Sequence, residues 1–138
     1  HKAVELAKKA LGDLEGKRIA ILGLAFKPNT DDIRESVSIK IINKLLEDRA
    51  SVIAYDPAAT TNTRKILGDR IKYASCAIEC INGADCCIVV TEWDEFKQLK
   101  PHDFINHMKK PLVIDGRRIF DPEEYGRKLE FTAIGLGR

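Results

Sequence analysis

The polar loop over residues 23–36 concentrates the side chains that could bind a charged ligand. It reads GLAFKPNTDDIRES, with a lysine, two aspartates and an arginine between positions 27 and 34. Lys27 is a compact positive charge that can meet an anionic oxygen, and Arg34 can bind phosphate through two parallel hydrogen bonds. Asp31 and Asp32 can hold these cations in place or cap a turn. The loop is a candidate anion-binding site, and the alternative is a solvated charged loop in front of a helix.

The glycine content of this loop separates it from the common phosphate-binding turns. Gly23 is its single glycine, whereas a dinucleotide-binding fingerprint has three, and no glycine stands directly before Lys27 as in a P-loop. Asp31 and Asp32 have no histidine beside them, which disfavours a metal site. We therefore expect contacts to anions through side chains, and no metal.

A second basic loop, Asp115-Gly116-Arg117-Arg118, follows an apolar segment near the end of the sequence. Gly116 allows a sharp turn there. Because Arg117 and Arg118 are neighbours, we expect them to point in opposite directions, with at most one facing a ligand. A pair of surface arginines is the alternative.

Asp56 stands between an apolar segment and Pro57, and two interpretations are open there. An acid at such a strand end binds ribose in NAD-binding folds. Without the glycine fingerprint, a capped turn before Pro57 is favoured. We expect Trp93 to be a packing residue, and His102 and His107 to be exposed.

The cysteines stand at positions 76, 80, 86 and 87, a spacing that matches no zinc ribbon or finger. We expect them to act as small apolar residues in a reduced, cytoplasmic protein. No Gly-rich turn, helix start or adjacent histidine marks one of them as an activated thiol. We therefore expect no catalytic thiol among them.

The composition bounds the possible functions. The 138 residues suffice for one domain with a real core, and 44% of them are hydrophobic. A formal net charge of +2 is too small to argue for nucleic-acid binding. The longest apolar run, over residues 86–90, is far shorter than a membrane span. We expect neither a nucleic-acid nor a membrane partner.

The elements that must position these residues alternate along the chain. Residues 1–14 are typical of a helix that Glu15-Gly16 stops, and His1 falls inside that pattern without a methionine, so we expect a piece of a longer protein. Strands are predicted over residues 18–22, 51–55, 71–74 (strand or merely extended), 86–90, 112–114 and 129–134. Ser36 or a neighbour is expected to cap a helix that runs to about residue 49. Further helices are predicted over residues 61–67, 77–81, 95–99, 103–108 and 122–125.

This alternation predicts an α/β fold: an open, mostly parallel, Rossmann-like sheet with helices on both faces. In such sheets ligands bind beyond the carboxyl ends of the strands. Both basic loops follow strands, so they are expected on the same edge of the sheet.

Four segments together resemble a known family. Residues 23–36, Tyr55-Asp56-Pro57, residues 91–96 (TEWDEF) and Asp115-Gly116-Arg117-Arg118 occur in the order typical of the UDP-glucose/GDP-mannose dehydrogenase family. The resemblance is to its C-terminal, UDP-binding domain and covers nearly the whole chain. The last two segments are most similar to the UDP-glucose 6-dehydrogenase branch.

The resemblance implies an enzyme that oxidises the C6 hydroxyl of UDP-glucose twice, giving UDP-glucuronate and two NADH. Phe26 and Lys27 match positions that contact the UDP-sugar, and Arg117 matches a substrate-binding arginine. Arg34 matches an arginine that reaches NAD. Val37 stands where relatives commonly have proline, which should matter little for the start of the helix.

The resemblance also implies a division of the protein. Residues 1–15 match the end of an interdomain helix that builds the family's homodimer, and residues 16–138 match the UDP-sugar-binding domain. The nucleophilic cysteine, the catalytic lysine and the glycine fingerprint for NAD belong to the family's N-terminal domain. This chain alone is therefore expected to be inactive.

Three alternatives remain beside this interpretation. The chain could belong to a sister dehydrogenase acting on UDP-N-acetylmannosamine or GDP-mannose. It could be a stand-alone, non-catalytic nucleotide-binding module, although a start inside a helix argues against that. A phospho-receiver domain is disfavoured because no acidic pair follows the first strand.

Overall fold

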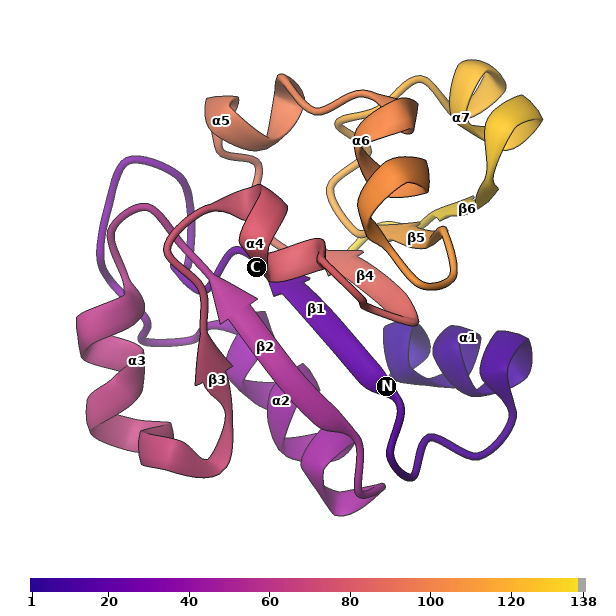
Figure 1. The fold of residues 1–138 in the computed structure, drawn as a ribbon. Coiled ribbons are helices and arrows are strands. Elements are labelled where there is room, and N and C mark those ends of the chain that lie inside the picture. The colour runs from indigo at the N-terminus through magenta and orange to yellow at the C-terminus, as the bar shows by residue number, and fades with distance from the viewer. Residues whose placement is uncertain (137–138) are drawn as a thin grey trace.

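The computed structural model describes residues 1–136 and places a six-stranded parallel sheet between two layers of helices (Figure 1). The strand order is β3-β2-β1-β4-β5-β6, and every neighbouring pair is parallel. This is the doubly wound order, with its reversal between β1 and β4. The predicted fold class is confirmed. The strands are β1 (Arg18–Leu22), β2 (Ser51–Tyr55), β3 (Lys72–Tyr73), β4 (Cys86–Val89), β5 (Leu112–Asp115) and β6 (Glu130–Ala133).

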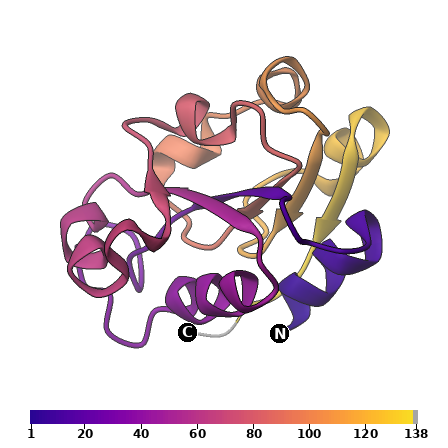
Figure 2. The ribbon, with the colours of Figure 1, turned by 60° about the horizontal axis from the view of Figure 1, so that its bottom comes forward.

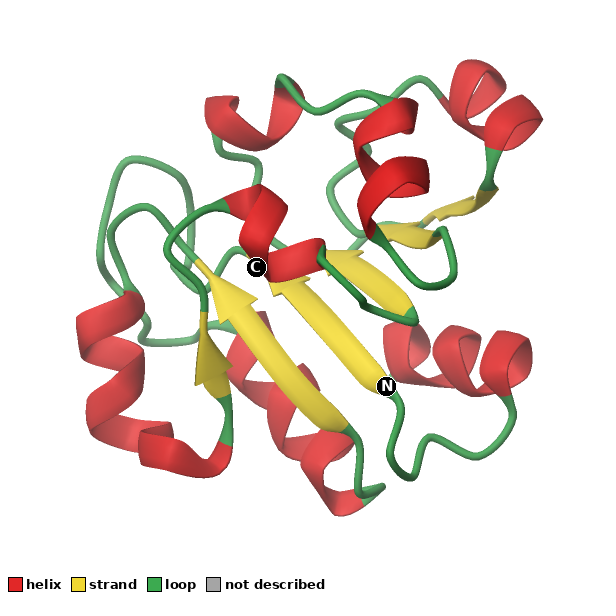
Figure 3. Cartoon of the chain, viewed as in Figure 1, coloured by secondary structure: helices red, strands yellow, loops and turns green. Residues whose placement is uncertain are grey.

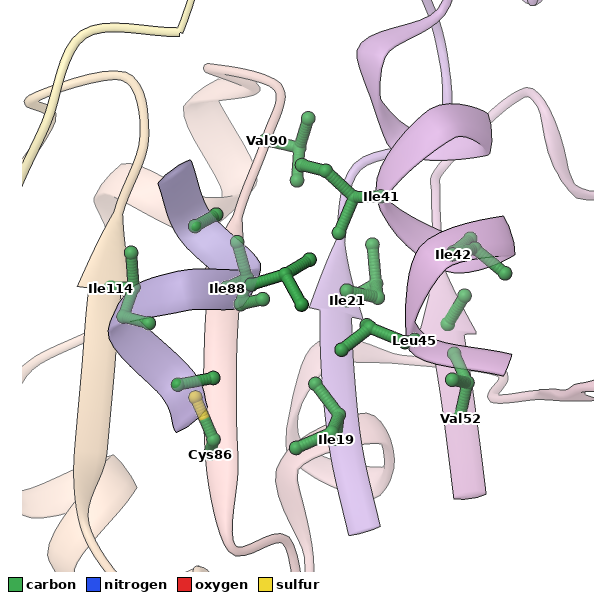
Figure 4. Close-up of a cluster of buried hydrophobic side chains, with 14 of the residues drawn as sticks. Ile19, Ile21, Ile41, Ile42, Leu45, Val52, Cys86, Ile88, Val90 and Ile114 are labelled. Atoms are coloured by element: carbon green, nitrogen blue, oxygen red, sulfur yellow. The ribbon is translucent and has the colours of Figure 1, made fainter. Parts of the chain in front are cut away.

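The central strands are apolar throughout because helices cover both of their faces. In β1, Ile19 and Ile21 pack into one core cluster, and Ala20 and Leu22 into the other. Figure 4 shows the first cluster, in which the β1 isoleucines meet side chains of α2 such as Leu45. A run of apolar residues therefore gives a buried parallel strand here, rather than an amphipathic one.

The helices divide between the two faces (Figure 2). One face carries α1 (Lys2–Leu11), α2 (Val37–Glu47) and α3 (Thr60–Leu67). The other carries α4 (Ala77–Ile81), α5 (Asp94–Lys97), α6 (Pro101–His107) and α7 (Pro122–Lys128). A 3₁₀ turn, η1 (Gly68–Arg70), leads into the two-residue β3. Figure 3 shows the loops that connect the helices to the strand ends, of which the loop over residues 23–36, between β1 and α2, is long.

The first helix ends earlier than predicted. It stops at Leu11, because Gly12 adopts a left-handed φ of 79° and its N–H bonds to the Lys8 carbonyl at 2.7 Å. Leu14 is buried beyond the helix end, which explains why its apolar position resembled a further helical turn. Helix α1 also contributes Ala3, Val4 and Ala7 to the core.

The cysteines follow the prediction at three positions and depart from it at one. Cys80, Cys86 and Cys87 are buried, and burial raises the pKa of the first two thiols to about 12. Cys76 is exposed and starts α4, where its Sγ accepts a hydrogen bond from the Glu79 N–H at 3.4 Å. The expectation that no cysteine lies at a helix start was therefore wrong for Cys76.

Candidate functional site

The loops after β1 and β4 touch at the point where the strand order reverses. Gly23 has a φ of 104°, and a Cβ built there would lie 2.5 Å from the Thr91 Cβ and 2.6 Å from its backbone nitrogen. These contacts leave no room for a side chain. Glycine at this position therefore lets the two loops pack directly against each other at the carboxyl edge of the sheet.

Asp56 holds this edge together from the end of β2. Its side chain is 3% exposed, and Oδ2 accepts hydrogen bonds from the N–H groups of Leu24 (2.7 Å) and Ala25 (2.9 Å) and from Trp93 Nε1 (3.1 Å). Oδ1 accepts from the two backbone N–H groups at residues 58–59, both at 2.8 Å. The capped turn predicted for Asp56 is confirmed. Both oxygens are engaged by protein donors, so the structure does not support the ribose-binding interpretation.

Three hydroxyl groups complete the base of the first loop. Ser36, Ser38 and Thr91 donate to the carbonyls of residues 23–25 at distances of 2.5 to 2.9 Å. Ser36 is the residue before α2, as predicted, but its hydroxyl bonds to the loop and does not cap the helix. The base of the loop, residues 23–25, is thus buried and its carbonyls accept hydrogen bonds from these hydroxyls. Beyond the base, exposed residues begin with Lys27.

The outer part of the loop is a closed turn. The Phe26 N–H donates to the Asp32 carbonyl at 2.6 Å, and Asn62 of α3 donates to the Asp31 carbonyl at 2.9 Å. Phe26 is half-buried and Lys27 is exposed. Lys27 is therefore presented directly beyond a rigid base, as an anion-binding lysine needs to be.

Asp32 and Arg34 form a forked ion pair on this turn. Arg34 Nε donates to Asp32 Oδ1 at 3.1 Å and Nη2 donates to Oδ2 at 2.9 Å. The hydrogen bonds from Arg34 lower the pKa of the Asp32 carboxyl to about 2, and Asp32 raises the pKa of Arg34. The expectation that an aspartate holds a cation in place is confirmed for Asp32.

Two hollows flank this ion pair, and Asp32 and Arg34 line both of them. One, of about 370 Å³, is completed by Phe26 and Glu35. The other, of about 420 Å³, lies on the side of α3 and includes Thr30 and Asn62. The ion pair therefore forms the partition between two places where a ligand could sit.

The two arginines of the second basic loop differ in burial. Arg117 is half-buried, and its guanidinium donates to the Val90 carbonyl at 2.7 Å and to the Leu136 carbonyl. Burial lowers the pKa of Arg117. Arg118 is exposed, with a φ of 54°. The two arginines thus occupy different environments, and that at most one of them faces a ligand stays a prediction.

Sequence reasoning missed the structural role of Asp115. This residue is fully buried, and its carboxylate accepts from the N–H groups of Arg117 (3.2 Å) and Phe120 (2.9 Å). It caps the loop after β5 as Asp56 caps the loop after β2. An aspartate that ends a buried strand before Pro or Gly is the signal common to both.

The predicted site residues lie along one edge of the sheet. Phe26, Lys27 and Arg34 share the loop after β1, and Arg117 reaches the Val90 carbonyl after the neighbouring β4. Within residues 1–136, no group of three or more His, Cys, Asp and Glu side chains could hold a metal ion. No helix in this part of the chain is long and apolar enough to cross a membrane.

Comparison with known proteins assigns the fold and this edge to a family. The model of the UDP-glucose/GDP-mannose dehydrogenase family, UDP binding domain, matches residues 20–122. The chain belongs to this family. The matched segment contains the first basic loop, Asp56 and the loop with Arg117.

Two similar curated proteins are both named UDP-glucose 6-dehydrogenase. UDP-glucose 6-dehydrogenase AglM of Haloferax volcanii is 50% identical over 112 residues, which is 81% of this chain and 25% of that protein. UDP-glucose 6-dehydrogenase YwqF of Bacillus subtilis is 36% identical over 96% of this chain and 30% of its own length. The chain thus spans between a quarter and a third of the length of these relatives.

A solved structure supports the same relationship. A UDP-glucose dehydrogenase from Pyrobaculum islandicum superposes with a TM-score of 0.80 at 33% identity, over 96% of this chain and 28% of that one. A UDP-D-ManNAc dehydrogenase from Pyrococcus horikoshii gives a TM-score of 0.74 at 28% identity, over 96% of this chain and 29% of that one. The second match shows that enzymes named for another nucleotide sugar share this domain.

Proposed function

We propose that this chain is the UDP-sugar-binding domain of an NAD-dependent UDP-glucose 6-dehydrogenase. The whole protein would convert UDP-glucose, two NAD⁺ and water into UDP-glucuronate and two NADH. The observation that carries the proposal is the family match joined to 50% identity with a protein of that name. The exposed Lys27 beyond a rigid loop base agrees with it, because a UDP-sugar carries an anionic diphosphate.

Phe26, Lys27 and Arg117 are the proposed contacts to the UDP-sugar. Phe26 offers a half-buried ring beside a hollow, and Lys27 offers an exposed ammonium group. Arg117 would act from a fixed position, because carbonyls at Val90 and Leu136 hold its guanidinium. We propose no catalytic residue in this chain, because the resemblance puts the family's nucleophilic cysteine and catalytic lysine in its N-terminal domain. Burial also raises the pKa of the thiols of Cys80, Cys86 and Cys87, which keeps them protonated.

The residues present fit a single contact to NAD. Arg34 has a side chain that is 89% exposed, with one edge held by Asp32, so it can meet an anionic diphosphate. The loop after β1 has no second glycine to let the backbone approach a pyrophosphate. NAD, which accepts hydride from C6 of the sugar, would accordingly be bound mainly by an N-terminal domain.

The remaining proposals concern the whole protein. Residues 1–15 would end an interdomain helix, and the N-terminal domain of the same protein would be the main partner of residues 16–138. We propose a homodimeric, cytoplasmic enzyme of polysaccharide biosynthesis, with neither nucleic acid nor membrane as a partner. Helix α1 buries Ala3, Val4 and Ala7 against this domain, so it would couple the domain rigidly to what precedes it.

A sister dehydrogenase is the second candidate. The 28% identity with the UDP-D-ManNAc dehydrogenase extends over 96% of this chain, and the proposed contacts suit the UDP part that such substrates share. A GDP-mannose dehydrogenase is a further alternative, whose substrate would carry guanine in place of uracil. A stand-alone nucleotide-binding module is the alternative without catalytic activity. A kinetic comparison of nucleotide sugars by the full-length protein separates them.

The test compares the isolated chain with the full-length protein. The isolated chain should bind UDP weakly in calorimetry and form no NADH. The full-length protein should form two NADH for each UDP-glucose. NADH formation by the isolated chain would contradict the domain assignment, and a preference of the full-length protein for another nucleotide sugar would contradict the substrate.

A further inference from the structure

Asp32 lies where the two proposed roles of the first loop meet. Its backbone carbonyl accepts from the Phe26 N–H at 2.6 Å, and its backbone N–H bonds to the Thr30 hydroxyl at 3.1 Å. Its carboxylate holds the Nε and Nη2 edge of Arg34. One residue thus contacts both the proposed UDP-sugar residue and the proposed cofactor residue.

The ion pair itself contributes little to folding. The Arg34 side chain is 89% exposed and that of Asp32 is 32% exposed, and exposed ion pairs have small net effects on stability. The fork does remove freedom from a long side chain that would otherwise sample many rotamers. Its evident consequence is a guanidinium held in one place, on the partition between the two hollows.

We propose that Asp32 is a positioning residue for Arg34, fixing one edge of the guanidinium so that the Nη1 end can meet the diphosphate of NAD. Within residues 1–136 the structure gives Nη1 no hydrogen-bond partner, so that end is available. The inference rests on the function proposed above. It assigns to Asp32 a favourable effect on cofactor affinity that acts only through Arg34.

Two opposite effects of Asp32 on an anionic cofactor make the sign of the result informative. Its negative charge weakens the local attraction for a diphosphate. Its forked ion pair, by contrast, orders the Arg34 side chain before the cofactor binds, which lowers the entropy cost of binding. The pKa of about 2 keeps the carboxylate ionised at neutral pH, so both effects operate there. If positioning dominates, removing the charge weakens NAD binding; if repulsion dominates, it strengthens it.

The experiment measures NAD binding to the full-length protein by calorimetry and KM for NAD by kinetics. Asp32→Asn should raise the dissociation constant and KM for NAD about fivefold, from the cost of ordering one long side chain. KM for UDP-glucose should stay within about twofold of wild type. Asp31→Asn is the matched control, because it makes the same charge change one residue away and its exposed carboxylate makes no bond among the described residues.

A double-mutant cycle separates positioning from a direct or merely structural role. In an Arg34→Ala background, Asp32→Asn should no longer weaken NAD binding, because only the repulsion by the Asp32 charge remains there to be removed. In the protein that keeps Arg34, Asp32→Glu should retain much more NAD affinity than Asp32→Asn. Additive effects, tighter NAD binding by Asp32→Asn, or equal effects of Asp31→Asn and Asp32→Asn would each overturn the inference. Unchanged thermal unfolding midpoints would show that folding is not the cause.

The same variants distinguish failure of the inference from failure of the proposed function. A wild-type protein that binds NAD but does not reduce it with UDP-glucose would contradict the function, while the calorimetric cycle would still decide the role of Asp32. A wild-type protein that binds no NAD would overturn both.

Discussion

The loops after β1 and β5 place arginines at the same edge of the sheet in two different ways. Arg34 is bound by a carboxylate on the surface and keeps 89% of its side chain exposed. Arg117 is drawn inward and donates to the Val90 and Leu136 carbonyls. A carboxylate partner on the surface leaves most of an arginine exposed, whereas backbone carbonyls fix an arginine within the scaffold, so Arg117 would meet a ligand only from that fixed position.

Both loops nevertheless depend on a buried aspartate at a strand end. Among the described residues, the Asp56 carboxylate accepts five hydrogen bonds and the Asp115 carboxylate accepts two, all from protein donors. Buried carboxylates are costly unless they are satisfied in this way. The loops after β1 and β5 therefore have similar supports, although their arginines, Arg34 and Arg117, differ in exposure.

The largest expected effect comes from Asp56→Asn. The amide nitrogen of asparagine cannot accept a hydrogen bond, so in either orientation it would face backbone N–H groups, at least one of them buried, that lose their acceptor. We expect a loss of about 3–5 kcal/mol in the free energy of unfolding, measured by urea titration. Asp69→Asn in η1 is exposed and should change it by less than about 0.5 kcal/mol. Equal effects of the two variants would show that Asp56 does not support the loop.

Gly23→Ala should be the next most damaging change. The new Cβ would lie 2.5 Å from Thr91, and the φ of 104° suits glycine alone. We expect about 2–3 kcal/mol of destabilisation from overpacking and strain, again by urea titration. Gly126→Ala in α7 has open space around it and should stabilise the protein by about 0.5–1 kcal/mol. Destabilisation by both would point to a general intolerance of alanine.

These two positions illustrate what the sequence alone could predict. The apolar segments around Ile21 and Ile88 predicted the parallel sheet, because a strand covered on both faces must be apolar along its whole length. The basic loop and the turn that Asp56 caps were also predictable, because the residues that form a turn are neighbours in the sequence. The contact between Gly23 and Thr91 was not, because 68 positions separate two residues that only the strand order brings together.

The failures share this cause. Ser36 looked like a helix cap, but a carbonyl of Leu24 competes for its hydroxyl in the folded chain. Leu14 looked like a further turn of helix, but it is buried as part of a loop. Arg117 and Arg118 could not be separated in the sequence, because the carbonyls that select Arg117 belong to distant segments.

The comparison of the two arginines is tested by Arg117→Ala and Arg34→Ala. Loss of charged hydrogen bonds to buried carbonyls should reduce the free energy of unfolding by about 1–3 kcal/mol for Arg117→Ala. Arg34→Ala should change it by less than about 0.5 kcal/mol, like the exposed control Arg127→Ala in α7. A stability loss for Arg34→Ala equal to that for Arg117→Ala would remove the distinction between scaffold and displayed cation.

Lys27→Ala should affect binding without affecting folding. Removal of one charged hydrogen bond to the UDP diphosphate should weaken UDP-glucose binding to the full-length protein by about 1–3 kcal/mol. Lys128→Ala is the control, because this exposed lysine ends α7 just before β6 begins and so lies at the opposite edge of the sheet. Calorimetry and KM for UDP-glucose measure the effect, and an unchanged KM and kcat would contradict the assigned contact.

The smallest expected effect is the acid dependence contributed by Asp32. Its pKa falls from an ordinary 3.8 to about 2 in the folded protein, chiefly because Arg34 donates hydrogen bonds to it. A carboxyl whose folded pKa is depressed stabilises the fold at pH above its unfolded pKa and loses that contribution as the pH falls through the folded pKa.

The change in stability due to Asp32 should therefore lie between about pH 4 and pH 2, and solvent screening keeps it small because the ion pair is exposed. Urea titrations across this range should show a shallower acid loss for Asp32→Asn than for wild type, with Asp31→Asn as the control that keeps the wild-type loss. Arg34→Ala should make the acid loss shallower without abolishing it, because the backbone N–H at residue 34 still donates to Asp32 Oδ1 at 2.9 Å. An acid loss in Arg34→Ala as steep as that of wild type would mean that the carboxylate is held by something other than the Arg34 side chain, and the contrast between the two loops would lose its surface partner.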